Sequence, residues 1–163
     1  GADIAPQSFG EVPGFHTSNT DVMKQYFFDN NLDKYLANNT PIFGICLGFQ
    51  QLCVKFGGKL EQHYPFNYSP KGRHDKVDTL AFEQQMYDIV LKSSIPTKYE
   101  VNSLHHQGCF SLPNPFNVLA REKVDGNIEI ARFAENVYGV QYHPEEINDG
   151  ISEVIIKQLL NLE

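Results

Sequence analysis

The chain has 163 residues, and its 13 basic and 20 acidic side chains give a formal net charge of -7 at pH 7. This length allows one hydrophobic core and is too short for two ordinary domains, so we expect a single domain over residues 1–163. The acidic balance, with no basic cluster longer than Lys71-Gly72-Arg73, argues against a nucleic-acid partner.

The hydropathy of the sequence and its cysteine content indicate where in the cell the protein is expected. No apolar stretch approaches the roughly 18 residues that a spanning helix needs, so we expect no membrane partner. The three cysteines are an odd number without the spacing of a disulfide framework, which is typical of a reducing environment. We therefore expect a cytoplasmic protein.

The first part of the chain predicts a loop, a helix, a strand and a second helix. Residues 1–13 are rich in glycine and proline and predict a loop, whereas residues 21–38 predict a helix with one apolar face. A strand over residues 42–45 leads directly into a helix over residues 49–56, which two glycines close. Cys53 lies on the apolar stripe of that helix, where packing is expected rather than chemistry.

The remaining chain is richer in strands. Residues 59–80 predict strand-like pieces, with an edge strand at 74–77, and residues 82–91 predict a short helix or a turn. Four successive short strands are predicted at 99–104, 117–122, 127–133 and 138–142. Asp125-Gly126 predicts a hairpin turn, and a final helix over residues 149–162 has Asp149 as its N-cap. We expect an α/β fold of three layers, with a mostly parallel central sheet and an antiparallel extension.

Cys46 lies in Gly44-Ile45-Cys46-Leu47-Gly48, where the predicted strand meets the predicted helix. Glycines two residues before and two residues after it let the backbone turn tightly, which we expect to expose the sulfur. The first N–H groups of a helix are unpaired and the helix dipole is positive there, which favours a thiolate. The pattern therefore predicts an activated nucleophile. The alternative is a buried structural cysteine beside a tight turn.

A histidine near the C-terminus supplies a candidate base. Residues 136–142 predict a turn and a short strand that runs into His143-Pro144-Glu145. Because proline ends the strand, we expect His143 at a strand end that faces a cleft, with Glu145 turned back to its imidazole. A thiol, an imidazole and a carboxylate are the components of thiol acyl transfer, although His143 alone could be an ordinary surface histidine.

These segments carry a family resemblance that covers nearly the whole chain. Residues 41–50 and 139–145 resemble the class I glutamine amidotransferases, a flavodoxin-like fold whose members hydrolyse γ-glutamyl amides with a Cys-His-Glu triad. Residues 1–6, 101–107 and 125–129 resemble most closely the γ-glutamyl peptidase branch, typified by γ-glutamyl-γ-aminobutyrate hydrolase. Leu47 departs from that branch, where arginine is expected, and is common among true amidotransferases.

The beginning of the sequence also departs from the resemblance. Members of the family have one or two strands and a helix before the segment that corresponds to residues 1–3. A parallel sheet without its central strand would expose unpaired edges. We therefore expect this sequence to be the C-terminal two-thirds of a longer chain.

The resemblance implies a catalytic role for three side chains. Cys46 would attack the γ-carbonyl and form a γ-glutamyl thioester, with His143 as base and Glu145 as the group that orients it. The backbone N–H groups of Leu47 and Gly1 would form the oxyanion hole.

The resemblance also implies substrate contacts. Gln50, one helical turn after Cys46, would bind the α-amino or α-carboxylate group, although a surface glutamine is an equal alternative. Ser103, Leu104 and His105 would contact the α-carboxylate, although a histidine pair such as His105-His106 is often structural. No metal ligand set, phosphate-binding loop or cofactor is expected from the sequence.

Three functions remain open at this stage. The first is a stand-alone hydrolase that acts on a small γ-glutamyl amide. The second is a glutaminase subunit that delivers ammonia to a partner synthetase, which Leu47 favours. The third is a non-catalytic regulatory member of the fold, which the presence of Cys46, His143 and Glu145 disfavours.

Overall fold

The computed structural model describes residues 2–15, 17, 20–63, 77–86, 99–147 and 150–160. Its helical elements are η1 (Pro6–Phe9), α1 (Val22–Ala37), α2 (Leu47–Lys55), η2 (Pro144–Glu146) and α4 (Gly150–Leu159). Its strands are β1 (Ile42–Ile45), β2 (Lys59–Glu61), β3 (Val77–Phe82), β4 (Tyr99–Asn102), β5 (Gly108–Ser111), β6 (Asn117–Glu122), β7 (Ile128–Ala134) and β8 (Val137–Val140). No described helix is long and apolar enough to cross a membrane.

Local sequence signals explain where the first elements begin and end. Asp21 caps α1, because its side chain accepts a hydrogen bond from the Lys24 N–H at 3.0 Å. The helix α2 ends at Lys55 with Phe56 as its C-cap, and Gly57 follows with a φ of +81°, the left-handed conformation that is common just after a helix. The observed bounds of α1, β1 and β6 agree with the predicted ranges to within one residue.

The sheet is built around one parallel pair and a large antiparallel part. The strand order is β1-β8-β7-β6-β3-β4, and β5 pairs with both β2 and β7 beside this path. Within the described residues β1 and β8 run parallel, whereas the six other strand pairs run antiparallel. The antiparallel extension is therefore larger than the four predicted short strands indicated, because β2, β3 and β5 join it.

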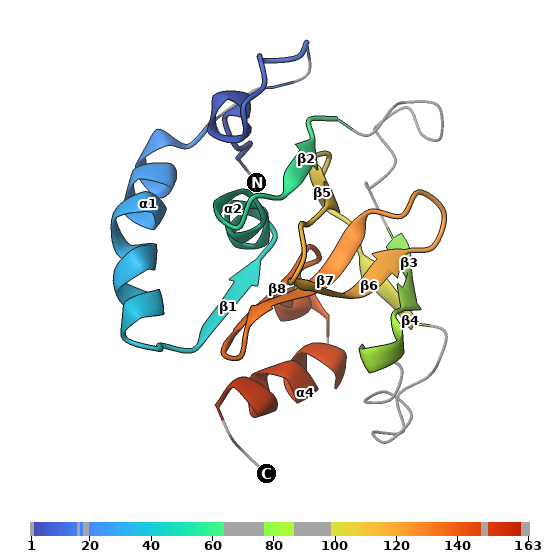
Figure 1. Cartoon of the computed structure of the whole chain (residues 1–163). Helices are drawn as coiled ribbons and strands as arrows, with labels where there is room; N and C mark the ends of the chain where they lie inside the picture. Colours follow the sequence, from blue (N-terminus) through green and yellow to red (C-terminus); the bar gives the residue numbers. More distant parts are fainter. Residues whose placement is uncertain are drawn as a thin grey trace.

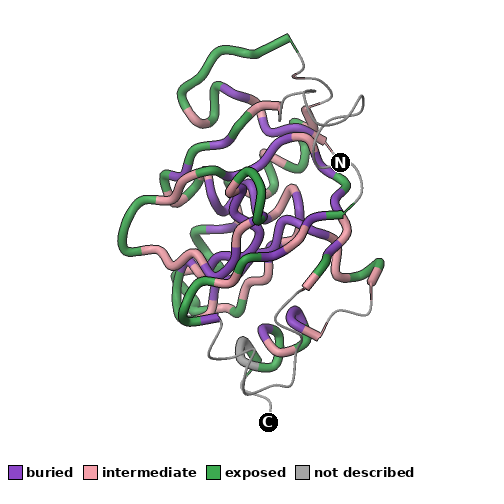
Figure 2. The backbone as a smooth tube through the Cα atoms, turned by 90° about the vertical axis from the view of Figure 1, so that its right-hand side faces the viewer, coloured by how far each residue is buried: buried purple, intermediate pink, exposed green. Residues whose placement is uncertain are grey.

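Helices cover the sheet on its two faces, which gives three layers (Figure 1). On one face, Leu32 of α1 and Leu52 of α2 belong to a buried cluster with Val137 of β8. On the other face, Ile151 and Ile155 of α4 pack in a second cluster that includes sheet residues of β7 and β8. Most buried residues lie toward the middle of the molecule, and many exposed residues lie in its outer loops (Figure 2). The predicted three-layer α/β fold is confirmed.

Several predictions fall wholly or partly outside the described residues. These are the Asp149 cap, the basic patch Lys71-Gly72-Arg73 and most of the edge strand at 74–77, of which only Val77 is described, at the start of β3. Residues 84–86 are helical, as predicted for residues 82–91, but Phe82 ends β3 and residues 87–91 lie outside the described part of the chain.

Candidate active site

Cys46 occupies the turn between β1 and α2 with an unusual backbone. Its φ of 48° and ψ of -106° place a non-glycine residue in a sterically disfavoured region. The turn is fixed from both sides, because Cys46 N–H donates to Val140 O at 2.9 Å and Gln50 N–H donates to Cys46 O at 3.0 Å. Strain held at a defined position is typical of functional residues.

Only one of the two flanking glycines is required by packing. A Cβ at Gly44 would lie 2.7 Å from Leu52 Cδ1 and 2.9 Å from the Gly48 carbonyl carbon. A Cβ at Gly48 would meet nothing within 4 Å. The expectation that both glycines permit the turn is therefore wrong for Gly48, because α2 leaves the turn with that side open.

The sulfur is less exposed and less acidic than the sequence suggested. Cys46 is 6% exposed, so the expectation of an exposed thiol is wrong. Burial raises the pKa of Cys46 and outweighs the Leu47 backbone N–H, which donates to the sulfur and acts to lower this pKa. The resting side chain is thus a neutral thiol, and a base must take its proton when it reacts.

His143 and Glu145 follow β8, the strand that neighbours β1. The parallel register pairs Ile45 with Val140, so Cys46 and the residues after β8 emerge at the same edge of the sheet. His143 Nδ1 hydrogen bonds to Glu145 Oε1 at 2.7 Å. Partial burial acts to raise the pKa of Glu145, but the hydrogen bond and charge of His143 leave that pKa below its ordinary value. The carboxylate therefore stays ionised and orients the ring.

The imidazole is positioned from its backbone as well. Asn102 Nδ2 donates to His143 O at 2.9 Å, and His143 N–H donates to Asn102 Oδ1 at 2.8 Å. No hydrogen bond between His143 and Cys46 is present among the described residues. The sulfur instead accepts a hydrogen bond from Gln141 Nε2 at 3.8 Å. Catalytic hydrogen bonds are often formed only in the substrate complex, so the role of His143 as the base stays a prediction.

A pocket opens beside the sulfur. Its cavity volume is about 30 Å³, and its wall is formed by Ala2, Asp3, Cys46, Gln50, Leu104, His105, His106 and Gln107. Gly1, the second predicted oxyanion donor, lies outside the described residues. Leu47, the first predicted donor, directly follows Cys46, and a hydrogen bond from its backbone N–H acts to lower the pKa of the thiol. The nucleophile therefore lies at the pocket, whereas Leu47 is not among the residues that form the pocket wall.

Gln50 is not the surface glutamine that the sequence left open, because it is 3% exposed. Its Nε2 donates to Gln107 O at 2.8 Å and to Gln141 Oε1 at 3.2 Å, which uses both amide hydrogens. Only Gln50 Oε1 remains to contact a ligand in the pocket, and an amide oxygen can accept a hydrogen bond but cannot donate one.

The three predicted contacts of the 103–105 segment are placed differently from one another. Leu104 is 45% exposed and lines the pocket, whereas Ser103 is buried and donates its hydroxyl to Asp78 Oδ2 at 2.9 Å. The His105 ring also lines the pocket, but Nδ1 donates to Gln107 O at 2.9 Å and Nε2 faces Asp78 and Glu129. Neither Ser103 nor the His105 nitrogens are directed to the pocket.

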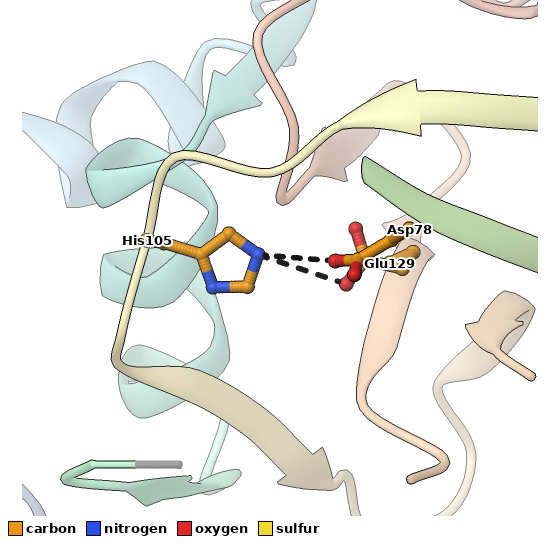
Figure 3. A group of neighbouring side chains, drawn as sticks. All are labelled: Asp78, His105 and Glu129. Atoms are coloured by element: carbon orange, nitrogen blue, oxygen red, sulfur yellow. Dashed lines mark ion pairs between the residues drawn. The ribbon is translucent and has the colours of Figure 1, made fainter. Parts of the chain in front are cut away.

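Figure 3 shows this buried ionic cluster of Asp78 from β3, Glu129 from β7 and His105. His105 Nε2 lies 3.6 Å from Asp78 Oδ2 and 3.9 Å from Glu129 Oε1. The His105 ring already carries a hydrogen on Nδ1, because Nδ1 donates to a carbonyl. If Nε2 is also protonated, His105 is an imidazolium that lies between two carboxylates. One ligand atom from each residue lies within 4.8 Å of the others, a spacing and donor set that a divalent cation could also use.

Sequence reasoning missed the residues that hold this site together. Asn102 and Gln107 lie in the motif at 101–107 and were not assigned roles, because a sequence does not show which backbone an amide will meet. Asp78 carries no local signal, since its partner His105 is 27 positions away (105 minus 78). Cys53, by contrast, is fully buried in the core as predicted.

Comparisons with known proteins agree with this arrangement. The peptidase C26 family model matches residues 1–145. The glutamine amidotransferase-like protein YvdE of Lactococcus lactis is 32% identical over 153 residues, or 89% of this chain and 63% of that protein. One subunit of the glutamine-hydrolyzing GMP synthase of Pyrococcus abyssi is 34% identical over 139 residues, or 81% of this chain and 67% of that protein.

A solved structure shows the fold independently. A glutamine amidotransferase from Thermotoga maritima superposes with a TM-score of 0.55 at 17% identity, over 84% of this chain and 59% of that one. The fold is therefore that of the class I glutamine amidotransferases. This chain spans between 59% and 67% of the lengths of these three proteins.

Proposed function

We propose that this chain, which belongs to the peptidase C26 family, hydrolyses γ-glutamyl amide bonds through a thioester on Cys46. The observation that carries the proposal is the strained turn at Cys46, with His143 emerging from the neighbouring parallel strand and the pocket opening at the sulfur. The γ-glutamyl peptidase branch is the finer assignment, supported by the resemblance of residues 101–107 and 125–129.

The reaction follows from the roles that these groups can fill. His143 takes the thiol proton as the Cys46 sulfur attacks the γ-carbonyl carbon, and the Leu47 N–H stabilises the oxyanion with a second donor from the Gly1 end of the N-terminal loop. The C–N bond then breaks, and His143 returns the proton to the leaving amine. Water, deprotonated by His143, cleaves the thioester and releases glutamate. Glu145 keeps the ring oriented throughout.

The pocket chemistry favours one orientation of the glutamyl group. Gln50 offers only its Oε1, an acceptor, so it would accept a hydrogen bond from the substrate's α-ammonium group and could not bind the α-carboxylate.

A glutaminase subunit that supplies ammonia to a synthetase is an equally supported second function. Leu47 after the nucleophile favours it, and so does the likeness to one component of a glutamine-hydrolyzing GMP synthase. In that case free glutamine is the substrate and a synthetase is the partner.

One experiment separates the two functions. The isolated chain is incubated with glutamine and, separately, with γ-glutamyl-p-nitroanilide, and the release of ammonia or of nitroaniline is measured, with Cys46→Ala as the control. Turnover of the anilide by the isolated chain supports the hydrolase. Release of ammonia from glutamine only when a synthetase is added supports the glutaminase. No turnover under any of these conditions refutes both and favours a regulatory member of the fold.

A further inference from the structure

The last residue of β4 and the segment that follows it hold two other parts of the site through side-chain amides. Asn102 pairs with both the N–H and the C=O of His143. Gln107 does the same to Ile4: the Ile4 N–H donates to Gln107 Oε1 at 2.9 Å, and Gln107 Nε2 donates to Ile4 O at 3.4 Å. In each case a side-chain amide makes the two hydrogen bonds that the main chain of a neighbouring strand would make in a sheet.

Gln107 is itself fixed relative to the nucleophile. It is 2% exposed, and its own carbonyl accepts hydrogen bonds from Gln50 Nε2 at 2.8 Å and from His105 Nδ1 at 2.9 Å. Gln50 lies on α2 one turn after Cys46, and it also contacts Gln141, whose amide donates to the sulfur. Three buried glutamines thus link the main chain of Ile4 to the sulfur through an unbroken series of hydrogen bonds.

We propose that Gln107 is a positioning residue that sets the place of the loop over residues 2–5 relative to the Cys46 sulfur. The inference rests on the proposed function, in which Gly1, the residue directly before this loop, supplies an oxyanion donor. Such a donor must lie about 2.7–3.1 Å from the developing charge, and a displacement of about 1 Å can cost about 100-fold in rate. Asp3 is held separately, by His106 Nε2 at 2.7 Å, so loss of Gln107 shifts the loop and does not release it.

The test compares Gln107→Leu with the wild type and with Gln51→Leu. Gln51 is a matched control, because it is another buried glutamine, its amide contacts Gln25, and neither of these residues lines the pocket. With γ-glutamyl-p-nitroanilide as the probe, we expect kcat of Gln107→Leu to fall about 10- to 100-fold with KM changed less than about threefold. Alkylation of Cys46 by iodoacetamide needs no oxyanion donor and should stay within about twofold.

A conservative variant adds a signature that a merely structural role would not give. In Gln107→Glu, a protonated carboxyl group can still accept from Ile4 N–H and donate to Ile4 O, whereas the carboxylate can only accept. The ratio of its kcat to that of the wild type should therefore rise as the pH falls. A ratio that does not change with pH would overturn the inference. A Gln107→Leu variant whose kcat stays within twofold of the wild-type value would also overturn it, and so would one whose kcat and Cys46 alkylation rate fall by the same factor.

A substrate-free measurement keeps the inference separate from the proposed function. Hydrogen exchange of the Ile4 amide, followed by NMR, should become at least about tenfold faster in Gln107→Leu and stay unchanged in Gln51→Leu, because that amide donates to Gln107 Oε1. If the wild type hydrolyses no γ-glutamyl amide, the proposed function fails while this exchange still decides whether Gln107 holds the loop. An unchanged Ile4 exchange rate overturns the inference.

Discussion

Replacing Gly44 by alanine should destabilise the chain, whereas the same change at Gly48 should not. The added methyl group at Gly44 would lie 2.7 Å from Leu52 Cδ1, and 2.9 and 3.0 Å from the carbonyl carbon and oxygen of Gly48. Leu52 Cδ1 is the end of a side chain that lines a pocket and can turn away, but the Gly48 atoms are backbone in the first turn of α2 and cannot move without displacing the helix.

The size of the effect follows from the overlap. Carbon atoms in contact normally lie about 3.5 Å apart, so the new methyl group is about 0.6 Å too close to the Gly48 carbonyl carbon (3.5 minus 2.9). Overpacking of this kind costs about 1–3 kcal/mol, and three close atoms place Gly44→Ala near the upper end, at about 3 kcal/mol. For a chain of this length, that lowers the melting temperature by about 6–12 °C. Gly48→Ala should instead gain about 0.5–1 kcal/mol from helix propensity.

Urea unfolding, followed by far-ultraviolet circular dichroism, measures both variants against the wild type. Equal unfolding midpoints for Gly44→Ala and Gly48→Ala would refute the packing argument. A destabilised Gly48→Ala would show that the open side of the turn is not open in solution.

Three further predictions concern the site itself. Cys46→Gly should abolish γ-glutamyl hydrolysis yet raise the free energy of unfolding by about 1–2 kcal/mol, because glycine relieves the strained φ of 48°; a less stable variant would contradict this. Alkylation of Cys46 should reach half its maximal rate at a higher pH than that of an exposed cysteine, because burial raises the pKa of its thiol, while fully buried Cys53 and Cys109 stay unmodified; mass spectrometry of peptides checks both. Glu145→Gln should slow turnover less than His143→Ala does. The Glu145→Gln variant should also have a slightly lower free energy of unfolding than the wild type at pH values above the ordinary glutamate pKa, and this difference should vanish as the pH falls through the lowered pKa of Glu145. A difference that persists in acid would contradict the pairing of Glu145 with His143.

The sequence predicted those elements that local signals specify. The Asp21 cap and the two glycines after Phe56 fix the ends of α1 and α2, and the run of apolar residues before Cys46 fixes β1, because each signal acts within a few residues. The strands β2 and β5 were not predicted as a pair. Their pairing, of Leu60 with Cys109 for example, joins segments about 50 positions apart, and no local pattern records it.

The same limit applies to the site. Cys46, His143 and Glu145 could be named from their motifs, and the structure places them at one edge of two parallel strands. The burial of the thiol could not be predicted, because it depends on how closely the pocket wall approaches the sulfur. The ionic cluster around His105 was also out of reach, since Asp78 and Glu129 come from different strands.

The central claim is that Cys46 carries the γ-glutamyl group during turnover, and acid quenching tests it directly. The chain is mixed with a saturating γ-glutamyl amide and quenched within a turnover, and the peptide that contains Cys46 is weighed by mass spectrometry. We expect a mass increase of one γ-glutamyl group on Cys46, absent from Cys46→Ala. Hydrolysis by the wild type with no adduct on this peptide, or hydrolysis that survives in Cys46→Ala, would contradict the account.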